Sequence, residues 1–336
     1  MSRRALLVIV AVLVALAAIV AIGPRPGAPP AGRSDAAFLP ELAPALADLT
    51  GVVVTGPGNQ VIATLARDGE RWVVREADGY PADVGKLRQN LQALADAKRL
   101  EEKTAAPEFY GRLGVDDPAA TGSRAIRLDF QGPTPVPAVI LGDTGINGAD
   151  AAYARRVGEA TSWLVSGRYE PGKLRGDWLD RGVVDLPAAK VRRVTITHPD
   201  GAALVLAKDS EAATDFTVAD LPRGRPLVFE GVANGIAGAL AALTFDGVDG
   251  RATLGDNPPK PVVARFETFD GLTVETSAWR LAVGTRYTVV ASAAADNAAA
   301  KAAADVINAR VGGWVYTLPD FKAELLTRRR EDLLQP

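Results

Sequence analysis

The chain contains no cysteine. This absence excludes disulfide bonds, thiolate metal sites, a cysteine nucleophile and a lipid anchor on cysteine. Histidine is scarce too, because His198 is the only one in 336 residues. Zinc enzymes and serine-dependent triads normally need more imidazoles, and no G-x-S-x-G sequence occurs. We therefore expect His198, in the turn "THPDG", to be an exposed turn residue, and we predict no metal or other cofactor.

Neither sign of charge is in excess. The chain has 38 Lys and Arg against 40 Asp and Glu, a formal net charge of −2. Proteins that bind nucleic acid usually carry a clustered basic excess, so we predict no nucleic-acid partner. Hydrophobic residues make up 48% of the chain, which is enough to build the core of one large or two ordinary domains.

Residues 5–22, "ALLVIVAVLVALAAIVAI", are 18 consecutive apolar residues. As a helix they span roughly 27 Å, close to the hydrocarbon thickness of a bilayer. Arg3 and Arg4 precede them, which predicts a cytoplasmic N-terminus and a periplasmic body behind a single-pass anchor in a bacterial inner membrane. A cleaved signal peptide is the alternative. Residues 23–49 begin with a Pro/Gly-rich spacer, "GPRPGAPPAGRS".

Two parts of the body have similar sequences. In each, three short apolar segments are separated by turn residues, the pattern of an antiparallel meander. The first part contains "VVVT" (52–55), "LARD" (65–68) and "RWVV" (71–74), and the second contains "VTIT" (194–197), "LAKD" (206–209) and "DFTV" (215–218).

A helix is predicted after each meander. In the first copy Val84, Leu87, Leu91 and Leu94 recur at helical spacing, and in the second copy residues 228–245 occupy the same place. Alternating segments follow both helices. The predicted fold class is therefore α+β, with two tandem repeats of antiparallel β-meander plus helix behind one N-terminal transmembrane helix.

The repeats give the expected domain boundaries. Repeat 1 covers residues 50–175, a linker covers 176–190, and repeat 2 covers 191–336. The copies differ at residues 293–311, an alanine-rich insertion that ends just before a glycine. Alanine is the best helix former and glycine favours helix ends, so we predict a surface helix there.

The segment "LRGDWLDRGVVDL" contains three carboxylates, Asp177, Asp180 and Asp185. The preceding "WLVSGRYEPGKL" aligns without a gap on "WVYTLPDFKAEL", which places Asp177 opposite Arg328 of the second copy. Since the carboxylates do not recur there, we interpret the cluster as a joint between the repeats. A catalytic dyad is the alternative.

Two further segments resemble ligand loops in part. "GYPADVGK" (79–86) has a glycine spacing one residue too long for a phosphate loop, and Leu87 stands where a magnesium-binding Ser or Thr is needed. "DTGINGAD" (143–150) shares Asp143 and a turn with calcium loops, but Ala154 replaces the bidentate Glu. We expect a helix start and a turn, with a calcium site as the alternative for the second segment.

Residues 231–245 contain no charged side chain. A helix that is apolar on all sides must be buried, either between the two repeats or against a membrane partner. Glycines at 231, 235 and 238 permit close helix approach. The candidate partner-docking face consists of Val232, Ile236, Leu240 and Leu243.

Several segments resemble a bacterial family called domain of unknown function 4340. They are "RWVVREADGYPADVGKLRQNLQALADAKRLEE", "EFYGRLGVDDP", "VILGDTGINGADAAYARRVGEATSWLVSG" and "WLDRGVVDLPAAKVRRVTI". The resemblance implies a membrane-anchored extracytoplasmic protein, since many members are encoded beside ABC-type permease and gliding-type transport components. It supplies no catalytic residues that could be carried over.

These observations predict a non-enzymatic scaffold or accessory subunit, with a permease and its ATPase as partners. The alternative is a periplasmic module that binds a glycan, lipid or peptide in a groove between the repeats. A pocket lined by Trp279 and Tyr287 would favour the alternative. Trp163 and Trp314 occupy equivalent strand positions, so we expect them in the core and not in a sugar-stacking platform.

Overall fold

The computed structural model describes residues 35–335. The predicted anchor, residues 5–22, lies outside these residues. Between residues 35 and 335, no helix is long and apolar enough to cross a membrane.

The chain divides into two compact units, and the second takes in a segment from the middle of the first. Of the described residues, unit 1 consists of 35–67 and Gly85–Lys173. Unit 2 consists of Asp68–Val84 and of the chain from Leu174 onward. Each unit is built on an antiparallel sheet with few helices, which confirms the predicted class of antiparallel α+β structure.

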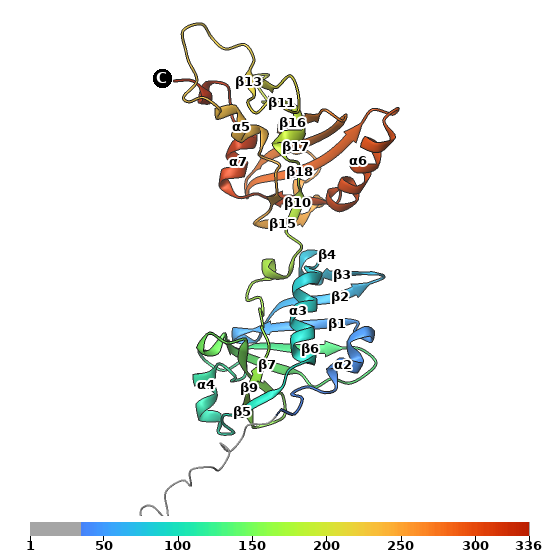
Figure 1. Cartoon of the computed structure of the whole chain (residues 1–336), viewed down its shortest axis with the longest axis vertical. Helices are drawn as coiled ribbons and strands as arrows, with labels where there is room; N and C mark the ends of the chain where they lie inside the picture. Colours follow the sequence, from blue (N-terminus) through green and yellow to red (C-terminus); the bar gives the residue numbers. More distant parts are fainter. Residues whose placement is uncertain (1–34, 336) are drawn as a thin grey trace, which may run out of the picture. The chain divides into compact units, whose positions relative to one another are not determined.

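The sheet of unit 1 has the strand order β2-β1-β6-β7-β8-β9-β5 (Figure 1). Neighbouring strands pair antiparallel. The strands are β1 (Gly51–Gly56), β2 (Gln60–Asp68), β5 (Arg99–Glu102), β6 (Ile126–Gln131), β7 (Val139–Thr144), β8 (Ala151–Arg156) and β9 (Ser162–Ser166).

The helices of unit 1 are α2 (Leu42–Ala45), α3 (Val84–Ala95) and α4 (Tyr110–Leu113). The structure confirms the helix predicted from the spacing of Leu87, Leu91 and Leu94. These three leucines are buried, whereas Val84, in the first turn, is 39% exposed. Helix α3 thus turns one apolar stripe to the core, as the 3.6-residue period requires.

The sheet of unit 2 has the order β13-β12-β11-β16-β17-β18-β19-β15, and a separate pair joins β10 to β14. In β17 buried and half-buried residues alternate, because successive side chains of a strand point to opposite faces. The strands of this sheet and pair are β10 (Gly182–Val184), β11 (Val191–Thr197), β12 (Ala203–Ala207), β13 (Thr217–Val218), β14 (Leu243–Thr244), β15 (Gly247–Gly250), β16 (Val262–Thr268), β17 (Leu272–Leu281), β18 (Gly284–Ala293) and β19 (Trp314–Thr317). Unit 2 also contains β3 (Arg71–Val74) and β4 (Tyr80–Pro81), which lie outside this sheet, in the order β4-β3-β2 of the first one.

The helix predicted over residues 228–245 is much shorter in the structure, where α5 covers only Val232–Ala237. Gly231 precedes it with a left-handed φ of 80°, and Gly238 is its C-cap. Beyond that cap the Lys322 ammonium donates to the carbonyl oxygens of Ala239 and Ala241, both at 2.9 Å. The chain then enters β14. Glycine weakens helices, and here it limits α5 to six residues.

The insertion forms the predicted surface helix, α6 (Ala298–Val311). The side chain of Asn297 caps it by accepting from the Ala300 N–H at 3.0 Å. The Asn308 side chain bonds to both the N–H and the carbonyl of Ala291 in β18, at 2.8 and 2.7 Å. Helix α6 therefore packs against β18. The last helix of unit 2 is α7 (Asp320–Leu326).

Tyr80 ties the segment Asp68–Val84 into unit 2. Its ring lies edge-on to Phe245 at 5.3 Å and to Trp314 at 5.0 Å, measured between ring centroids. Tyr316 completes the cluster at 6.5 Å. Tyr80 is 1% exposed, and burial raises the pKa of its hydroxyl to about 12. We call these four side chains the aromatic cluster.

Replacing Tyr80 by Ala should destabilise unit 2 by about 3–5 kcal/mol, because large-to-Ala changes in a core leave a cavity as well as lost contacts. Tyr80→Phe keeps the edge-on rings and should cost less than about 1.5 kcal/mol. Urea unfolding followed by tryptophan fluorescence measures both variants. Equal losses in the two variants would mean that ring packing is not what holds the segment.

Candidate functional site

A groove of about 610 Å³ lies at one end of the sheet of unit 2. The end of β11, the start of β16, the end of β17 and the start of β18 meet there, since neighbouring antiparallel strands run in opposite directions. We call it the basic groove. It is lined by His198, Pro199, Asp200, Pro259, Lys260, Val262, Ala278, Arg280, Thr285, Tyr287, Thr327, Arg329 and Asp332.

Strand register forms the floor of the basic groove. Val262 pairs with Ala278, and Ala278 pairs in turn with Tyr287, so the three side chains form one cross-strand row. Arg280 pairs with Thr285 and lies two residues beyond Ala278, on the same face. Lys260 precedes Val262 by two residues. An apolar floor is thus followed by a polar and basic rim.

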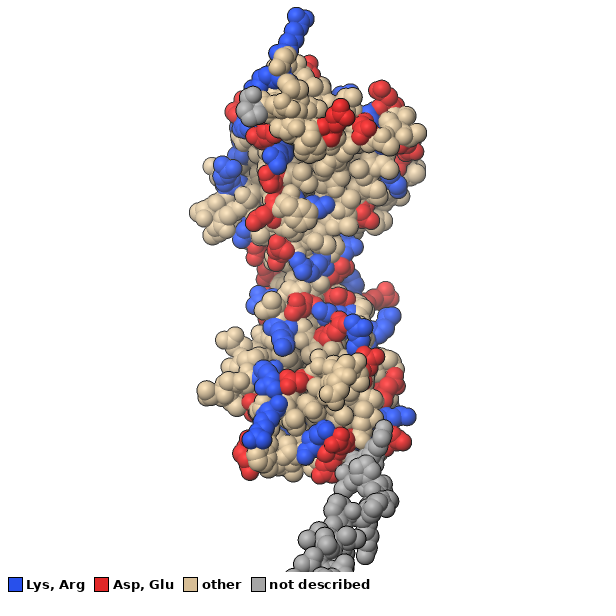
Figure 2. All heavy atoms as spheres, turned by 60° about the vertical axis from the view of Figure 1, so that its left-hand side comes forward, with Lys and Arg blue, Asp and Glu red and all other residues tan. Residues whose placement is uncertain are grey.

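Two cations of the groove are not neutralised. In the part of the chain that the structure describes, neither Lys260 nor Arg280 forms an ion pair, and both are exposed. Basic and acidic residues are interspersed on the face drawn in Figure 2. Neither cation was predicted as a site residue from the sequence. The alternation of side chains along β17 could have predicted that Arg280 and Ala278 share a face of the sheet. That Thr285 lies opposite Arg280 could be known only from the pairing of β17 with β18.

The two acids of the groove are engaged by one residue. Asp200 Oδ2 accepts from the Arg329 guanidinium at 2.9 Å, and Asp332 Oδ2 accepts from the Arg329 backbone N–H at 2.8 Å. Asp200 also accepts from the Ala202 N–H at 3.0 Å. These bonds, first that from Ala202 and then that from Arg329, lower the pKa of Asp200. Asp200 and Asp332 therefore organise the wall of the groove.

His198 is buried, at 7% exposure, so the prediction of an exposed turn residue is wrong. Its Nε2 lies 3.3 Å from the carbonyl oxygen of Arg328. A carbonyl oxygen only accepts, so Nε2 is the protonated nitrogen in this contact. The C-terminal segment folds back over the turn and covers the imidazole, a long-range contact that no local pattern announces.

Tyr287 lines the basic groove, whereas Trp279 is not among its lining residues. Trp279 precedes Arg280 by one position and follows Ala278, so it points to the opposite face of β17. Its Nε1 donates to Thr288 Oγ1 at 3.3 Å. Tyr287 is 2% exposed, and burial raises the pKa of its hydroxyl to about 12, which keeps it neutral.

The predicted docking residues lie mainly inside unit 2. Ile236, Leu240 and Leu243 are between 0% and 1% exposed, and Val232 is half-buried. Val232 and Ile236 border a second hollow of about 280 Å³, which we call the apolar groove. Its other lining residues are Val228, Phe229, Gly231, Gly235, Leu325, Arg328, Asp332 and Leu333.

The three carboxylates of the joint each bind a structural partner. Asp177 accepts from the Leu174 N–H at 3.0 Å, and Asp185 accepts from the Ala242 N–H at 2.8 Å. Asp180 pairs with Arg310 of α6 at 2.7 Å. Each side chain thus fixes a different piece of backbone or helix of unit 2.

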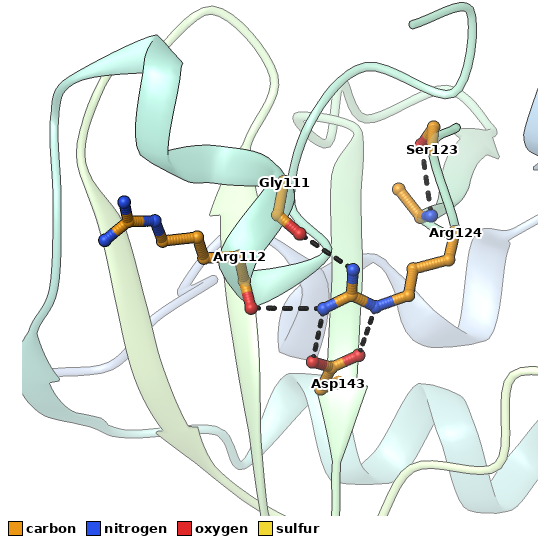
Figure 3. Close-up of polar contacts among 6 residues, drawn as sticks. Gly111, Arg112, Ser123, Arg124 and Asp143 are labelled. Carbon is orange, nitrogen blue, oxygen red and sulfur yellow. Dashed lines mark hydrogen bonds and ion pairs between the residues drawn. The ribbon is translucent and has the colours of Figure 1, made fainter. Parts of the chain in front are cut away.

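Asp143, the first residue of the calcium-like segment, is bound by Arg124 in unit 1 (Figure 3). The guanidinium makes two bonds to the carboxylate, at 2.8 and 2.7 Å, and also donates to the carbonyl oxygens of Gly111 and Arg112 at 2.7 and 3.1 Å. Arg124 thereby binds the end of α4 to β7. Among residues 35–335, no group of three or more His, Cys, Asp or Glu is placed to hold a metal ion.

Removing the Arg124 guanidinium should destabilise unit 1 by about 1–2 kcal/mol, since two carbonyl contacts are lost together with a half-exposed ion pair. Arg124→Met is compared with Arg168→Met, which removes a more exposed pair with Glu170 and should cost less than about 0.5 kcal/mol. Urea unfolding at pH 7 measures both changes. Equal losses in the two variants would contradict a special role for Arg124.

The same pair should make unit 1 sensitive to acid. Hydrogen bonds from Arg124 lower the pKa of Asp143 below the ordinary value of an aspartate side chain. The stabilisation is therefore complete above the unfolded pKa and is lost as pH falls through the lower folded value. Asp143→Asn should remove this part of the pH dependence below about pH 4. If the unfolding free energy of Asp143→Asn depended on pH in the same way as that of the native protein, this prediction would be wrong.

Comparisons with known proteins identify the chain at the level of a family. No curated protein and no solved structure matches it. A family model described as "Domain of unknown function (DUF4340)" matches residues 72–260, just over half of the chain. The matched range includes Arg124, Asp143 and the joint, and it ends at Lys260 in the basic groove. This protein therefore belongs to the DUF4340 family.

Proposed function

We propose that this protein is a non-enzymatic accessory subunit, or scaffold, of an ABC-type transport or other envelope complex. It is anchored in the bacterial inner membrane through residues 5–22, with the N-terminus in the cytoplasm and both units in the periplasm. The length of the apolar run and the arginines before it support the anchor and its orientation.

The observation that carries this proposal is an exposed apolar surface on unit 2. Phe229 lines the apolar groove and is 61% exposed, and Val228 beside it is 40% exposed. Phe321 of α7 is 62% exposed and lies one helical turn before Leu325, another lining residue. Exposed aromatic side chains around an apolar hollow are typical of surfaces that bind another protein.

We also infer that the units are two copies of one fold. Seven strands of unit 1 follow the order β2-β1-β6-β7-β8-β9-β5, and seven of unit 2 follow β12-β11-β16-β17-β18-β19-β15. The sequence similarity between "WLVSGRYEPGKL" and "WVYTLPDFKAEL" falls at equivalent strands, β9 and β19. A duplicated body gives an accessory subunit two related surfaces, of which unit 2 carries the apolar groove.

The test is crosslinking in intact membranes followed by affinity capture of the full-length protein. We expect recovery of a permease and its ATPase, and we expect that recovery to fall at least tenfold for a chain that lacks residues 1–22. Phe229→Asp should also reduce recovery at least tenfold, because a carboxylate in an interface core loses its hydration without gaining a partner.

Val306→Asp is the matched control. Val306 is 73% exposed on α6, far in sequence from the apolar groove, and its substitution should leave recovery unchanged. Recovery of the same partners with Phe229→Asp as with Val306→Asp would exclude the apolar groove as the docking surface. Recovery of neither permease nor ATPase by the full-length protein would overturn the accessory-subunit proposal.

The alternative function is a periplasmic ligand-binding module. The basic groove favours it, because its volume of about 610 Å³ falls in the range of small-molecule sites and Tyr287 contributes to its floor. A lipid, glycan or peptide that purifies with the protein in the absence of protein partners would shift the conclusion to this alternative.

A further inference from the structure

The lining of the basic groove carries more cationic than anionic side chains, with Lys260, Arg280 and Arg329 against Asp200 and Asp332. Lys260 and Arg280 line it and form no ion pair. The strand register places Lys260 two residues before Val262 and Arg280 two residues after Ala278, the partner of Val262. The two cations therefore lie just beyond this cross-strand row, at the same end of the sheet.

The acids of the groove do not neutralise this pair. Asp200 and Asp332 are both bound by Arg329, one through its guanidinium and the other through its backbone N–H. Arg329 in turn is held at the wall by Asp200. Asp332 keeps its negative charge, because a backbone N–H is neutral. The lining therefore carries three cationic side chains, Lys260, Arg280 and Arg329, against the two carboxylates. Like charges that share a groove repel one another, and a bound anion relieves this repulsion.

A neutral donor stands opposite Arg280. Thr285 pairs directly with Arg280 across the β17–β18 hairpin and lines the same groove. Within residues 35–335 its hydroxyl makes no side-chain hydrogen bond. A guanidinium binds two oxygens of a phosphate or carboxylate side by side, and a hydroxyl and an ammonium nearby can bind a third oxygen or the same ones.

The rest of the groove fits an apolar body. The row of Val262, Ala278 and Tyr287 forms its floor, and Pro199 and Pro259 stand at its sides. The neutral hydroxyl of Tyr287 is turned to the carbonyl oxygen of Ala323 at 3.4 Å, so the ring presents carbon to the groove. Most small-molecule sites combine such an apolar lining with a few polar groups that orient the ligand.

We propose that the basic groove binds an oxyanion, a phosphate or carboxylate, carried by a small ligand whose apolar part lies on the Val262–Ala278–Tyr287 row. Arg280 and Lys260 supply the charge, and Thr285 supplies an additional hydrogen bond. The site shares Asp332 with the apolar groove, but none of its proposed ligand-binding residues lines that groove, and the site does not depend on the accessory-subunit proposal.

Isothermal titration calorimetry of the full-length protein in a non-ionic detergent tests the site. The probes are inorganic phosphate and dihexanoylphosphatidylglycerol, with dihexanoylphosphatidylcholine as the zwitterionic control. We expect saturable binding of at least one anionic probe and no binding of the control. Arg280→Gln and Lys260→Gln should each weaken binding about tenfold or more, and binding should weaken as salt is raised.

Arg265→Gln is the matched control variant. Arg265 lies on β16 one residue from Ala264 and three from Val262, on the opposite face of the same sheet, and should leave affinity unchanged. Thr285→Val provides a second, uncharged test, with an expected loss of about threefold to tenfold.

The probes also distinguish the source of the anion. Binding of dihexanoylphosphatidylglycerol without binding of inorganic phosphate supports the site and assigns it to a lipid headgroup, and binding of inorganic phosphate alone supports the site and assigns it to a small free anion. Absence of saturable binding for both anionic probes would overturn the proposal. So would equal affinity in the native protein and in the Arg280→Gln, Lys260→Gln double variant.

Discussion

The packing of the Tyr80 ring connects the segment Asp68–Val84 to the rest of unit 2. Its edges meet Phe245 and Trp314, and Tyr316 closes the cluster, so a residue from a meander early in the sequence packs among strands that come much later. Backbone bonds reinforce this packing, since the Asp83 N–H donates to the Trp178 carbonyl at 2.8 Å. The segment that contains Trp178 and the segment Asp68–Val84 thus belong to one unit.

The basic groove and the apolar groove of unit 2 both depend on the strand register of its sheet and on the position of its C-terminal segment. The floor of the basic groove exists because β16, β17 and β18 are in register, with Val262, Ala278 and Tyr287 in one row. A shift of one residue would turn Arg280 to the other face and Trp279 toward the groove. The wall is completed by Arg329, while Leu333 of the same segment lines the apolar groove.

Local patterns predicted local structure well. The helical spacing of Leu87, Leu91 and Leu94 correctly predicted α3. The alanine-rich composition and the glycine at its end correctly predicted α6. The prediction of a helix over 228–245 was wrong in length. Gly231, with a left-handed φ, and Gly238, the C-cap, end the helix although the residues around them are apolar. Burial of His198 and the pairing of Arg280 with Thr285 could not be predicted, since they depend on a chain return and on a strand register. The role of Tyr80 depends on partners that no nearby residue reveals.

The distribution of the aromatic cluster along the sequence has a consequence for synthesis. Tyr80 leaves the ribosome 236 residues before Tyr316, its last ring partner, which is on the order of ten to fifty seconds at about 5–20 residues per second. Residues 85–173 are synthesised in that interval, before Phe245, Trp314 and Tyr316 exist. The ring of Tyr80 therefore remains without its aromatic partners until β19 has been made.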